Sequence, residues 1–305
     1  MRPLDNRPRA DRPLDGLAFG AFRTLAFICR RLPASAVLAL WRAVAWLAGD
    51  VLRLRRGVVD RQLLSCFPDL SSHTRRRLAR GVYDHLARTI AELLGPRPAA
   101  VAAAIGVQPG WEAVDLALAG GRGAIIASAH LGNFELGGRV LAARYRLLDV
   151  VKPMRNRRFD RWLQAERRSH RIGTVTVDGA APAVLAHLRA GGLVSLLLDQ
   201  DAGAGGVRIP FLGREASAWP GAARFSLQTG CPVIPMGIIR QPDGSHVLHV
   251  GTALEPAGRA GDDEGIRQYT AEISLAVESW VRRAPEQWFW VHRRWKEVER
   301  SSSVR

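Results

Sequence analysis

A histidine and a carboxylate stand five residues apart where an apolar run ends, in the stretch AIIASAHLGNFELGG (residues 124–138). The run stops at His130, and Glu135 falls in the first turn of a helix that Asn133 can cap. A carboxylate bonded to one imidazole nitrogen fixes the tautomer and leaves the other nitrogen free as a base. The spacing leaves two alternatives: a His130–Glu135 pair that takes a proton from a hydroxyl group, or a helix-capping glutamate beside an incidental histidine.

The sequence lacks the residue patterns of a zinc site and of a serine hydrolase. The spacing around His130 is not HExxH and offers no third zinc ligand nearby, and no GxSxG nucleophile elbow is present. The three cysteines are scattered and odd in number, which is typical of a reducing compartment rather than a disulfide framework. We therefore expect no metal and no bound cofactor.

From residue 110 onward, short apolar runs alternate with helical patterns. The expected strands are 123–129, 147–152, 193–199, 232–239 and 246–251. The expected helices are 111–120, 134–146, 156–171, 181–190 and 219–229. Continuous apolar strands are typical of a sheet covered on both faces. This pattern predicts a single α/β domain with a mixed, mostly parallel sheet flanked by helices, and His130 at a strand end, where functional groups gather in such folds.

The first hundred residues have a different character. Residues 1–15 are polar and proline-containing, which predicts disorder. The segments 16–32 and 34–56 are apolar but interrupted by arginines, so neither has the ~18 unbroken apolar residues of a membrane span. Two amphipathic helices packed on the core, or helices that enter the membrane interface, both fit, and one short span stays possible. A helix should follow, starting near His73 behind a serine cap and ending at Gly95-Pro96.

The chain carries a net charge of +16, and 42 of its 44 basic residues are arginines. Residues 1–100 hold 18 arginines against 8 acidic residues, hence +10 of the total. An anionic membrane or nucleic acid would both attract such a surplus. The apolar, tryptophan-containing neighbourhood favours the membrane.

Several stretches resemble, in the same order, one enzyme family. SAHLGNFEL resembles the H-x4-D/E motif of the glycerolipid acyltransferase superfamily, in the H-x-G-N-(W/F)-E form of the lipid A biosynthesis acyltransferase family. The other similar stretches are RQLLSCFPDLSSHTRRRLAR, VKPMRNRRFDRWL, LLLDQDAGAGGVRIPFLGREA, TGCPVIP and PEQWFWVHRRWK. Together they cover about residues 58–296, and the last is specific.

The resemblance implies an O-acyltransferase. An acyl thioester, on acyl carrier protein or coenzyme A, would donate its acyl group to a hydroxyl of a membrane glycolipid such as a lipid A precursor. His130 would be the general base and Glu135 would orient it and stabilise its charge. An arginine (Arg155, Arg167 or Arg168) or backbone N–H groups would stabilise the oxyanion.

Further side chains are candidates for substrate binding. Lys152 and Asn156 match a family block, and Asn133 lies inside the histidine motif. Asp199 and Gln200 follow a strand and form either a polar strand end or a wall of the site. In the last motif we expect Arg293 and Arg294 to face phosphates and Trp290 to lie in the core.

The expected organisation is a disordered terminus (1–15), a membrane-associating helical region (16–57), an acyltransferase domain (58–298) and a flexible tail (299–305). The expected location is the cytoplasmic face of the bacterial inner membrane, and the expected partners are an anionic membrane, a glycolipid acceptor and the thioester carrier, without nucleic acid. Other acceptors, such as a phosphatidylinositol mannoside or an aminolipid, stay open. So does a basic protein that binds acidic lipid or nucleic acid without catalysis.

Overall fold

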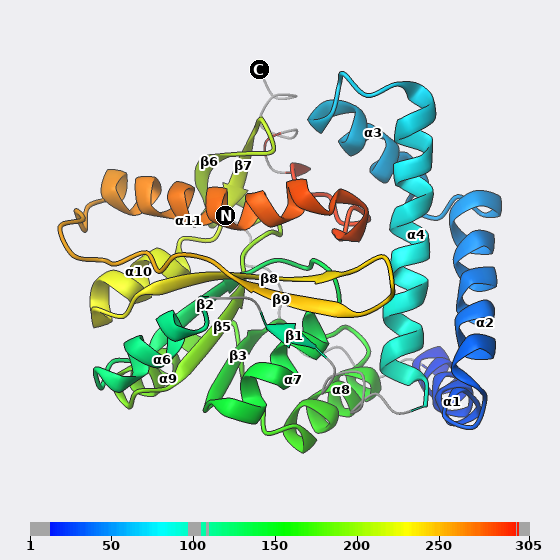
Figure 1. Ribbon diagram of the computed structural model, residues 1–305, viewed down its shortest axis with the longest axis horizontal. Helices are drawn as coiled ribbons and strands as arrows, with labels where there is room; N and C mark the ends of the chain where they lie inside the picture. Colours follow the sequence, from blue (N-terminus) through cyan, green and yellow to red (C-terminus); the bar gives the residue numbers. More distant parts are fainter. Residues whose placement is uncertain (1–12, 97–104, 108–109, 297, 299–305) are drawn as a thin grey trace.

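A seven-stranded sheet forms the centre of the molecule in the computed structural model, which describes residues 13–96, 105–107, 110–296 and 298 (Figure 1). The strand order is β1-β9-β8-β2-β5-β3-β4, and all pairings are parallel except β8 with β9. The strands are β1 Gly106–Val107, β2 Ala124–Ser128, β3 Leu147–Val151, β4 Gly173–Thr176, β5 Leu193–Leu197, β8 Val233–Arg240 and β9 His246–Val250. The predicted α/β class with a mixed, mostly parallel sheet is confirmed.

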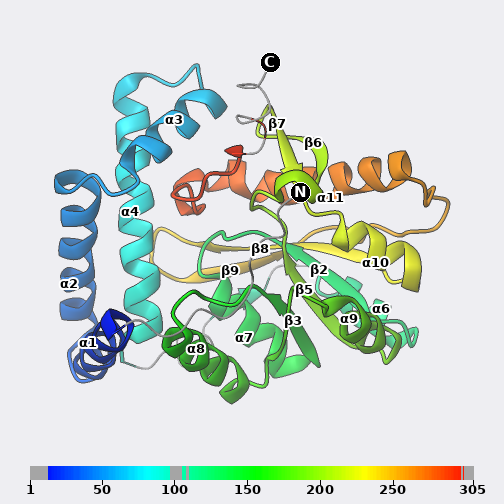
Figure 2. The same cartoon turned by 180° about the vertical axis from the view of Figure 1, so that it is seen from behind.

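Helices cover both faces of this sheet (Figures 1 and 2). One face packs against α9 (Ala180–Arg189), α10 (Gly221–Thr229) and α11 (Asp263–Arg283). The other face packs against α6 (Glu112–Ala119) and α7 (Phe134–Arg144), with α8 (Arg157–Ser169) next to β4. The central strands β2, β5 and β8 are mostly apolar because side chains on both faces of the sheet are buried.

Some elements have no counterpart among the expected ones. These include β1, β4, the hairpin of β6 (Val207–Phe211) and β7 (Arg214–Ala218), the long helix α11, and the 3-10 turns at Gly203–Gly205 and Pro285–Gln287. The short strands β4 and β6 are partly exposed and carry polar residues, so they lack the apolar runs that identify the buried strands.

The N-terminal helices stand to one side of the sheet. They are α1 (Pro13–Cys29), α2 (Ala34–Trp46) with a π-helical turn at Leu47–Val51, α3 (Arg56–Cys66) and α4 (Ser72–Leu94). Of these helices, α2 and α4 run side by side in both views (Figures 1 and 2). Ser71 caps α4 by accepting from the backbone N–H of Thr74, as the serine cap predicts.

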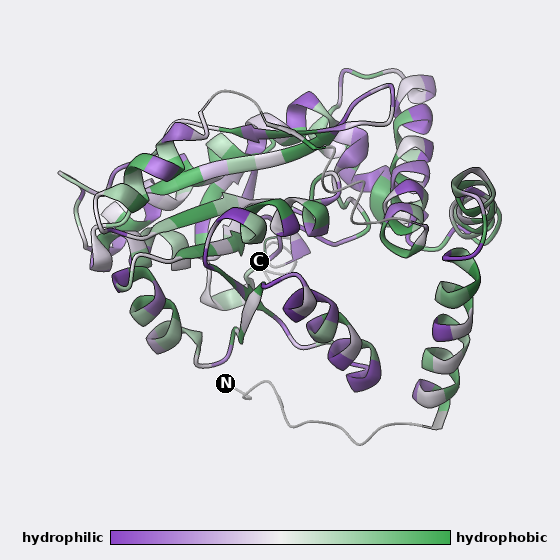
Figure 3. Cartoon of the chain, turned by 60° about the horizontal axis from the view of Figure 1, so that its bottom comes forward, coloured by the Kyte–Doolittle hydropathy of each residue, from purple (hydrophilic) through white to green (hydrophobic). Residues whose placement is uncertain are grey.

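Most of the large exposed apolar side chains belong to this N-terminal region. They include Leu14, Leu17, Phe27, Ile28, Val44, Trp46, Leu47, Val51, Leu52 and Leu54. In Figure 3 the helix that follows the grey N-terminal trace is mostly green, the colour of hydrophobic residues. By length and composition alone, the stretch Ala34–Val51 is apolar enough to cross a membrane, and only 11% of it is buried.

Two expectations concern the chain ends. Residues 1–12 of the expected disordered terminus and the expected tail at 299–305 lie outside the described residues. The expectation of disorder is wrong for residues 13–15, because α1 begins at Pro13 and its first turn contains Asp15.

Candidate active site

His130 lies at the carboxyl end of β2, and a carboxylate from the neighbouring strand β5 holds it. The Nδ1 of His130 donates to Oδ1 of Asp199 at 2.8 Å, and its backbone N–H donates to Oδ2 at 2.9 Å. Strands β2 and β5 pair in parallel from Ala124 with Leu193 to Ser128 with Leu197, so both chains end together at this edge. A carboxylate only accepts, so the proton of the neutral imidazole sits on Nδ1.

A tryptophan of the C-terminal motif fixes Asp199 in turn. The Nε1 of Trp288 donates to Oδ2 of Asp199 at 2.6 Å, and both side chains are buried. Burial by itself raises the pKa of Asp199, but the charge of His130 and the three donated hydrogen bonds outweigh it and lower the pKa. For His130 burial lowers the pKa, and the carboxylate of Asp199 reverses the direction, so the pKa is raised. The pair therefore consists of the ionised carboxylate of Asp199 and the imidazole of His130, whose basicity the carboxylate increases.

Asp199 bonds Nδ1 of His130 and leaves the second ring nitrogen, Nε2, for another partner. Its nearest hydrogen-bonding group is Nε2 of Gln200, at 3.4 Å, a long contact in which the amide donates and the imidazole accepts. The His130 side chain is 21% exposed, whereas that of Asp199 is 2% exposed. A substrate hydroxyl can thus approach Nε2 while the other nitrogen stays fixed.

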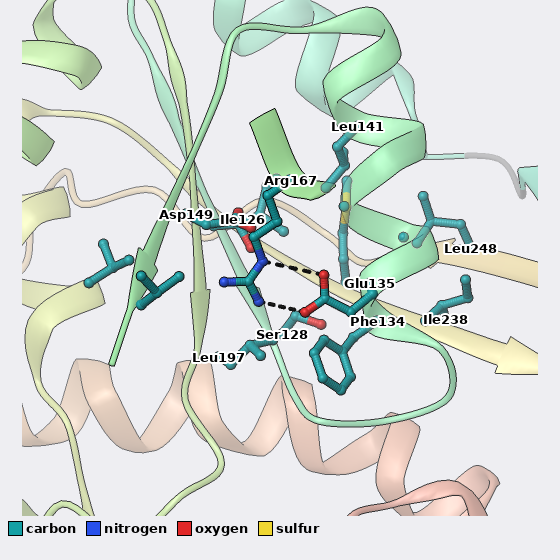
Figure 4. Close-up of a pocket in the computed structure, with 16 residues that line it drawn as sticks. Ile126, Ser128, Phe134, Glu135, Leu141, Asp149, Arg167, Leu197, Ile238 and Leu248 are labelled. Atoms are coloured by element: carbon teal, nitrogen blue, oxygen red, sulfur yellow. Dashed lines mark hydrogen bonds and ion pairs between the residues drawn. The ribbon is translucent and has the colours of Figure 1, made fainter. Parts of the chain in front are cut away.

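The predicted partner of His130 is wrong, because Glu135 bonds an arginine instead of the imidazole. Glu135 lies in the first turn of α7 and accepts from Nη2 of Arg167 at 2.5 Å and from Nε at 3.3 Å (Figure 4). The reason is the direction of the helix: α7 carries Glu135 toward α8, while the end of β5 brings Asp199 to Nδ1. The third guanidinium nitrogen of Arg167 points away from Glu135 (Figure 4).

Two mainly apolar pockets meet at this ion pair. The inner pocket has about 630 Å³ of empty space, partly open to solvent, between α7 and the sheet, and Phe134, Leu141, Met236 and Leu248 are among its walls. The outer pocket has about 650 Å³, partly open to solvent, and its walls include Phe22, Leu93, Trp162 and Leu163 from α1, α4 and α8. Glu135 and Arg167 line both. The Phe134 ring also packs edge-on against His130, at 5.0 Å between centroids, so the inner pocket begins next to the imidazole.

Asn133, predicted to bind substrate, forms its hydrogen bonds within the protein. Its side chain is fully buried, accepts from the N–H of Leu136 as the cap of α7, and donates to Oε2 of Glu92 at 2.9 Å. Glu92 of α4 also accepts from Nε and Nη2 of Arg240, both at 2.8 Å. This buried network supports the loop that carries His130.

The predicted basic residues divide between the surface and the core. Lys152, Arg155, Arg168 and Arg293 are exposed, and none lines either pocket. Asn156 caps α8 and donates to the backbone carbonyl of Asp15, so it ties α8 to α1.

The prediction that Arg294 faces phosphate is wrong. This side chain is 1% exposed, donates to the carbonyl oxygens of Ser217 and Gln200, and stacks over the Phe211 ring at 5.1 Å. Burial lowers its pKa to about 10. The mixture of aromatic and basic residues gave no information on which of them point inward. The prediction for Trp290 is confirmed, because its side chain is 0% exposed.

The C-terminal motif and the histidine loop form one unit. Leu131 and Trp288 form an antiparallel bridge, the N–H of Gly132 donates to the carbonyl of Gln287, and the N–H of Phe289 donates to the carbonyl of His130. Gly132 has a φ of +59°, and a Cβ there would collide with the carbonyl oxygen of Ile238. The glycine of the motif is therefore a requirement of this close packing.

Sequence reasoning placed Asp199 and Gln200 on a possible site wall, and the structure brings both to His130. It missed Trp288 and Arg167 as the partners of the two carboxylates. The ends of β2 and β5 were a usable signal for Asp199, since each polar residue follows a buried strand. Among the described residues no group of three or more His, Cys, Asp or Glu side chains could hold a metal ion.

Comparison with known proteins identifies the family. The model of the bacterial lipid A biosynthesis acyltransferase family matches residues 17–297, so the chain belongs to this family and is an acyltransferase. The chain is 25% identical over 273 residues to the lipid A biosynthesis palmitoleoyltransferase of Escherichia coli (strain K12), covering 87% of each chain. It is also 25% identical over 270 residues to the lauroyltransferase of the same strain, again with 87% of each chain covered.

A solved structure gives a weaker comparison. The 1-acyl-sn-glycerophosphate acyltransferase PlsC from Thermotoga maritima superposes with a TM-score of 0.37 at 15% identity, over 83% of this chain and 98% of that chain.

Proposed function

We propose that this enzyme transfers a fatty acyl chain from an acyl thioester, on acyl carrier protein or coenzyme A, to a hydroxyl group of a membrane glycolipid of the lipid A precursor class. The observation that carries the proposal is the imidazole of His130. It is fixed through Nδ1 by a buried carboxylate, accessible through Nε2, and adjacent to an apolar pocket. The family and the names of its relatives support the acceptor class.

In this reaction Nε2 of His130 takes the proton of the acceptor hydroxyl as its oxygen attacks the thioester carbonyl carbon. The imidazolium that forms is stabilised by Asp199, which already bonds Nδ1. The tetrahedral intermediate then collapses, the carbon–sulfur bond breaks, and the leaving thiolate takes the proton from His130. The products are an ester and a free thiol, and no covalent bond to the enzyme forms.

Glu135 acts in this proposal through Arg167 rather than through the imidazole. The two hydrogen bonds of the ion pair hold the guanidinium at the junction of the two pockets. The third nitrogen, which points away from Glu135 (Figure 4), is then available to stabilise the negative charge that develops on the thioester oxygen. Arg155 and Arg168 are exposed and are not proposed for this role.

The N-terminal helices serve in the proposal as the membrane contact on the cytoplasmic face of the inner membrane. Their exposed leucine, phenylalanine and tryptophan side chains, together with the arginines between them, suit the interface of an anionic bilayer. The outer pocket lies between α1, α4 and α8, and Glu135 and Arg167 line it. A lipid in the membrane that the N-terminal helices contact can therefore reach this ion pair.

Mass spectrometry of the lipids of a deletion strain, complemented with wild type or with His130→Ala, tests the proposal. We expect a glycolipid that lacks the mass of one acyl chain in the deletion strain, restored by wild type alone. A mass loss from a phosphatidylinositol mannoside or an aminolipid would replace the proposed acceptor. An unchanged lipid profile, together with salt-sensitive binding to acidic lipid or nucleic acid that His130→Ala retains, would replace catalysis by binding.

A further inference from the structure

Asp149 and Ser195 form a row of polar side chains on the sheet, among the apolar walls of the inner pocket. The register pairs Asp149 of β3 with Ser195 of β5, and Ser195 with Ile126 of β2, so these side chains share one face of the sheet. All three line the pocket, and Ser128 lines it two positions beyond Ile126 (Figure 4). A carboxyl group therefore lies on the floor of a cavity whose other walls are mostly hydrocarbon.

The carboxyl of Asp149 has a buried oxygen with no partner. Within the described part of the chain, its Oδ1 accepts no hydrogen bond. The charged groups that face it are Arg167 and Glu135, which form the ion pair between the two pockets, and neither forms a hydrogen bond with this oxygen. Burial raises the pKa of Asp149 to about 7, so near neutral pH its protonated form can both donate and accept a hydrogen bond.

An unpartnered buried polar group costs about 1–3 kcal/mol, which a ligand that supplies the missing hydrogen bond can recover. A saturated hydrocarbon chain in this pocket cannot supply it, whereas a chain that carries a hydroxyl group can. We propose that the inner pocket binds the donor acyl chain and that Asp149 forms a hydrogen bond with a hydroxyl group on that chain. The enzyme then prefers a hydroxylated fatty acyl donor, and this inference rests on the proposed acyl transfer.

The register also indicates where the hydroxyl lies. Ser195, which is level with Asp149, precedes Asp199 by four residues, or about 13 Å of extended strand. The catalytic pair is at the strand ends, and the polar row is deeper along the sheet. The preferred hydroxyl is therefore part-way along the chain rather than next to the thioester carbon.

The first experiment measures binding without turnover, in the full chain carrying His130→Ala. A fluorescent fatty acid occupies the pocket and is displaced by dodecanoic acid or by each positional isomer of hydroxydodecanoic acid. We expect one internal isomer to displace the probe about tenfold better than dodecanoic acid, the effect of one added hydrogen bond of ordinary strength. Asp149→Val in the same background abolishes the preference, and Asp149→Asn, whose amide still hydrogen-bonds, retains part of it.

Asp69→Val is the matched control, because Asp69 is an exposed aspartate that lines neither pocket. It should leave the preference unchanged, and thermal unfolding verifies that each variant is folded. If Asp149→Val does not fold, Asp149→Asn decides the question: an unreduced preference in that variant overturns the inference. Equal displacement by all the acids, or a preference that survives Asp149→Val, overturns it as well.

Transfer assays on the wild type separate this inference from the proposed function. Transfer of dodecanoyl and hydroxydodecanoyl groups from their thioesters at equal kcat/KM contradicts the role of Asp149 alone. Absence of transfer from any acyl thioester to any glycolipid acceptor contradicts the proposed function, whatever the fatty acids do in the binding assay.

Discussion

Asp199 holds Nδ1 of His130 at 2.8 Å from a position 69 residues away in the sequence, while the carboxylate five residues away bonds an arginine. The orientation of the imidazole thus depends on two parallel strands ending at the same edge of the sheet rather than on the histidine motif alone. This arrangement assigns different roles to the two carboxylates: Asp199 acts on the base, and Glu135 acts on Arg167.

Replacing Asp199 by asparagine should reduce kcat by about 10²-fold or more, because the amide no longer stabilises the imidazolium. The carboxylate raises the pKa of His130, so its removal lowers that pKa. A base is active when deprotonated, and the acid limb of the pH profile of kcat/KM should therefore move to lower pH. Measuring that profile from pH 5 to 9 checks the shift, and an acid limb at the wild-type position would contradict the assignment.

The Trp288→Phe variant tests the support of Asp199. It removes the donor to Oδ2 and keeps an aromatic ring, so we expect kcat/KM to fall about tenfold, as the loss of one charge-assisted hydrogen bond implies. Trp290→Phe is the matched control, because Trp290 is equally buried but donates to the carbonyl of Pro285. Both variants should lose stability in thermal unfolding. Equal loss of activity in the two would mean that Trp288 acts only through packing.

Glu135 and Arg167 should behave as one unit. Glu135→Gln and Arg167→Met each break the ion pair, and we expect each to lower kcat/KM, while the double variant loses little more than the worse single one. A double-mutant cycle on acyl transfer measures the coupling, which should be about 0.5–3 kcal/mol for directly bonded side chains. Effects that simply multiply would show that the two residues act separately.

Asp149 should make stability fall as the pH rises. Its pKa is raised to about 7 in the folded chain, against about 3.9 in an unfolded one, so the folded state binds more protons between these values. Asp149→Asn should therefore have a higher Tm than wild type at pH 8, and the difference should shrink toward pH 4. Thermal unfolding across that range measures it, and a difference that is independent of pH would contradict the buried, proton-binding carboxyl.

The stability that Glu92 and Arg240 give to the histidine loop should persist at mildly acidic pH. Burial alone raises the pKa of Glu92, but the contact with His246 at 3.1 Å and the hydrogen bonds from Arg240 outweigh it and lower the pKa to about 2. The stability that Glu92 contributes is present above its unfolded pKa of about 4.3 and is lost as the pH falls toward 2. Glu92→Gln should cost about 3–5 kcal/mol in the free energy of unfolding at pH 7, because it leaves Arg240 buried without its partner. A loss below about 1 kcal/mol in urea unfolding would show that water replaces the carboxylate.

The sequence predicted the features that follow from local residue patterns and missed the contacts between residues far apart in the chain. Buried strands such as β2 and β5 are mostly apolar, so their positions and the class of the fold followed from pattern alone. Contacts across the sheet did not: His130 was paired with the nearest carboxylate in sequence, although its partner is Asp199. Likewise Arg294 carries a charge that sequence reasoning assigns to the surface, whereas it is enclosed by the carbonyls of Ser217 and Gln200.

The role of His130 as general base is tested by the rate of acyl transfer by purified enzyme from a labelled acyl thioester to a lipid A precursor in mixed vesicles, compared between wild type and His130→Ala. We expect a fall in kcat of about 10²–10⁴-fold with the Tm little changed, as for the loss of a general base on a partly exposed ring. Transfer by His130→Ala at a rate near that of wild type would show that this imidazole does not activate the acceptor hydroxyl.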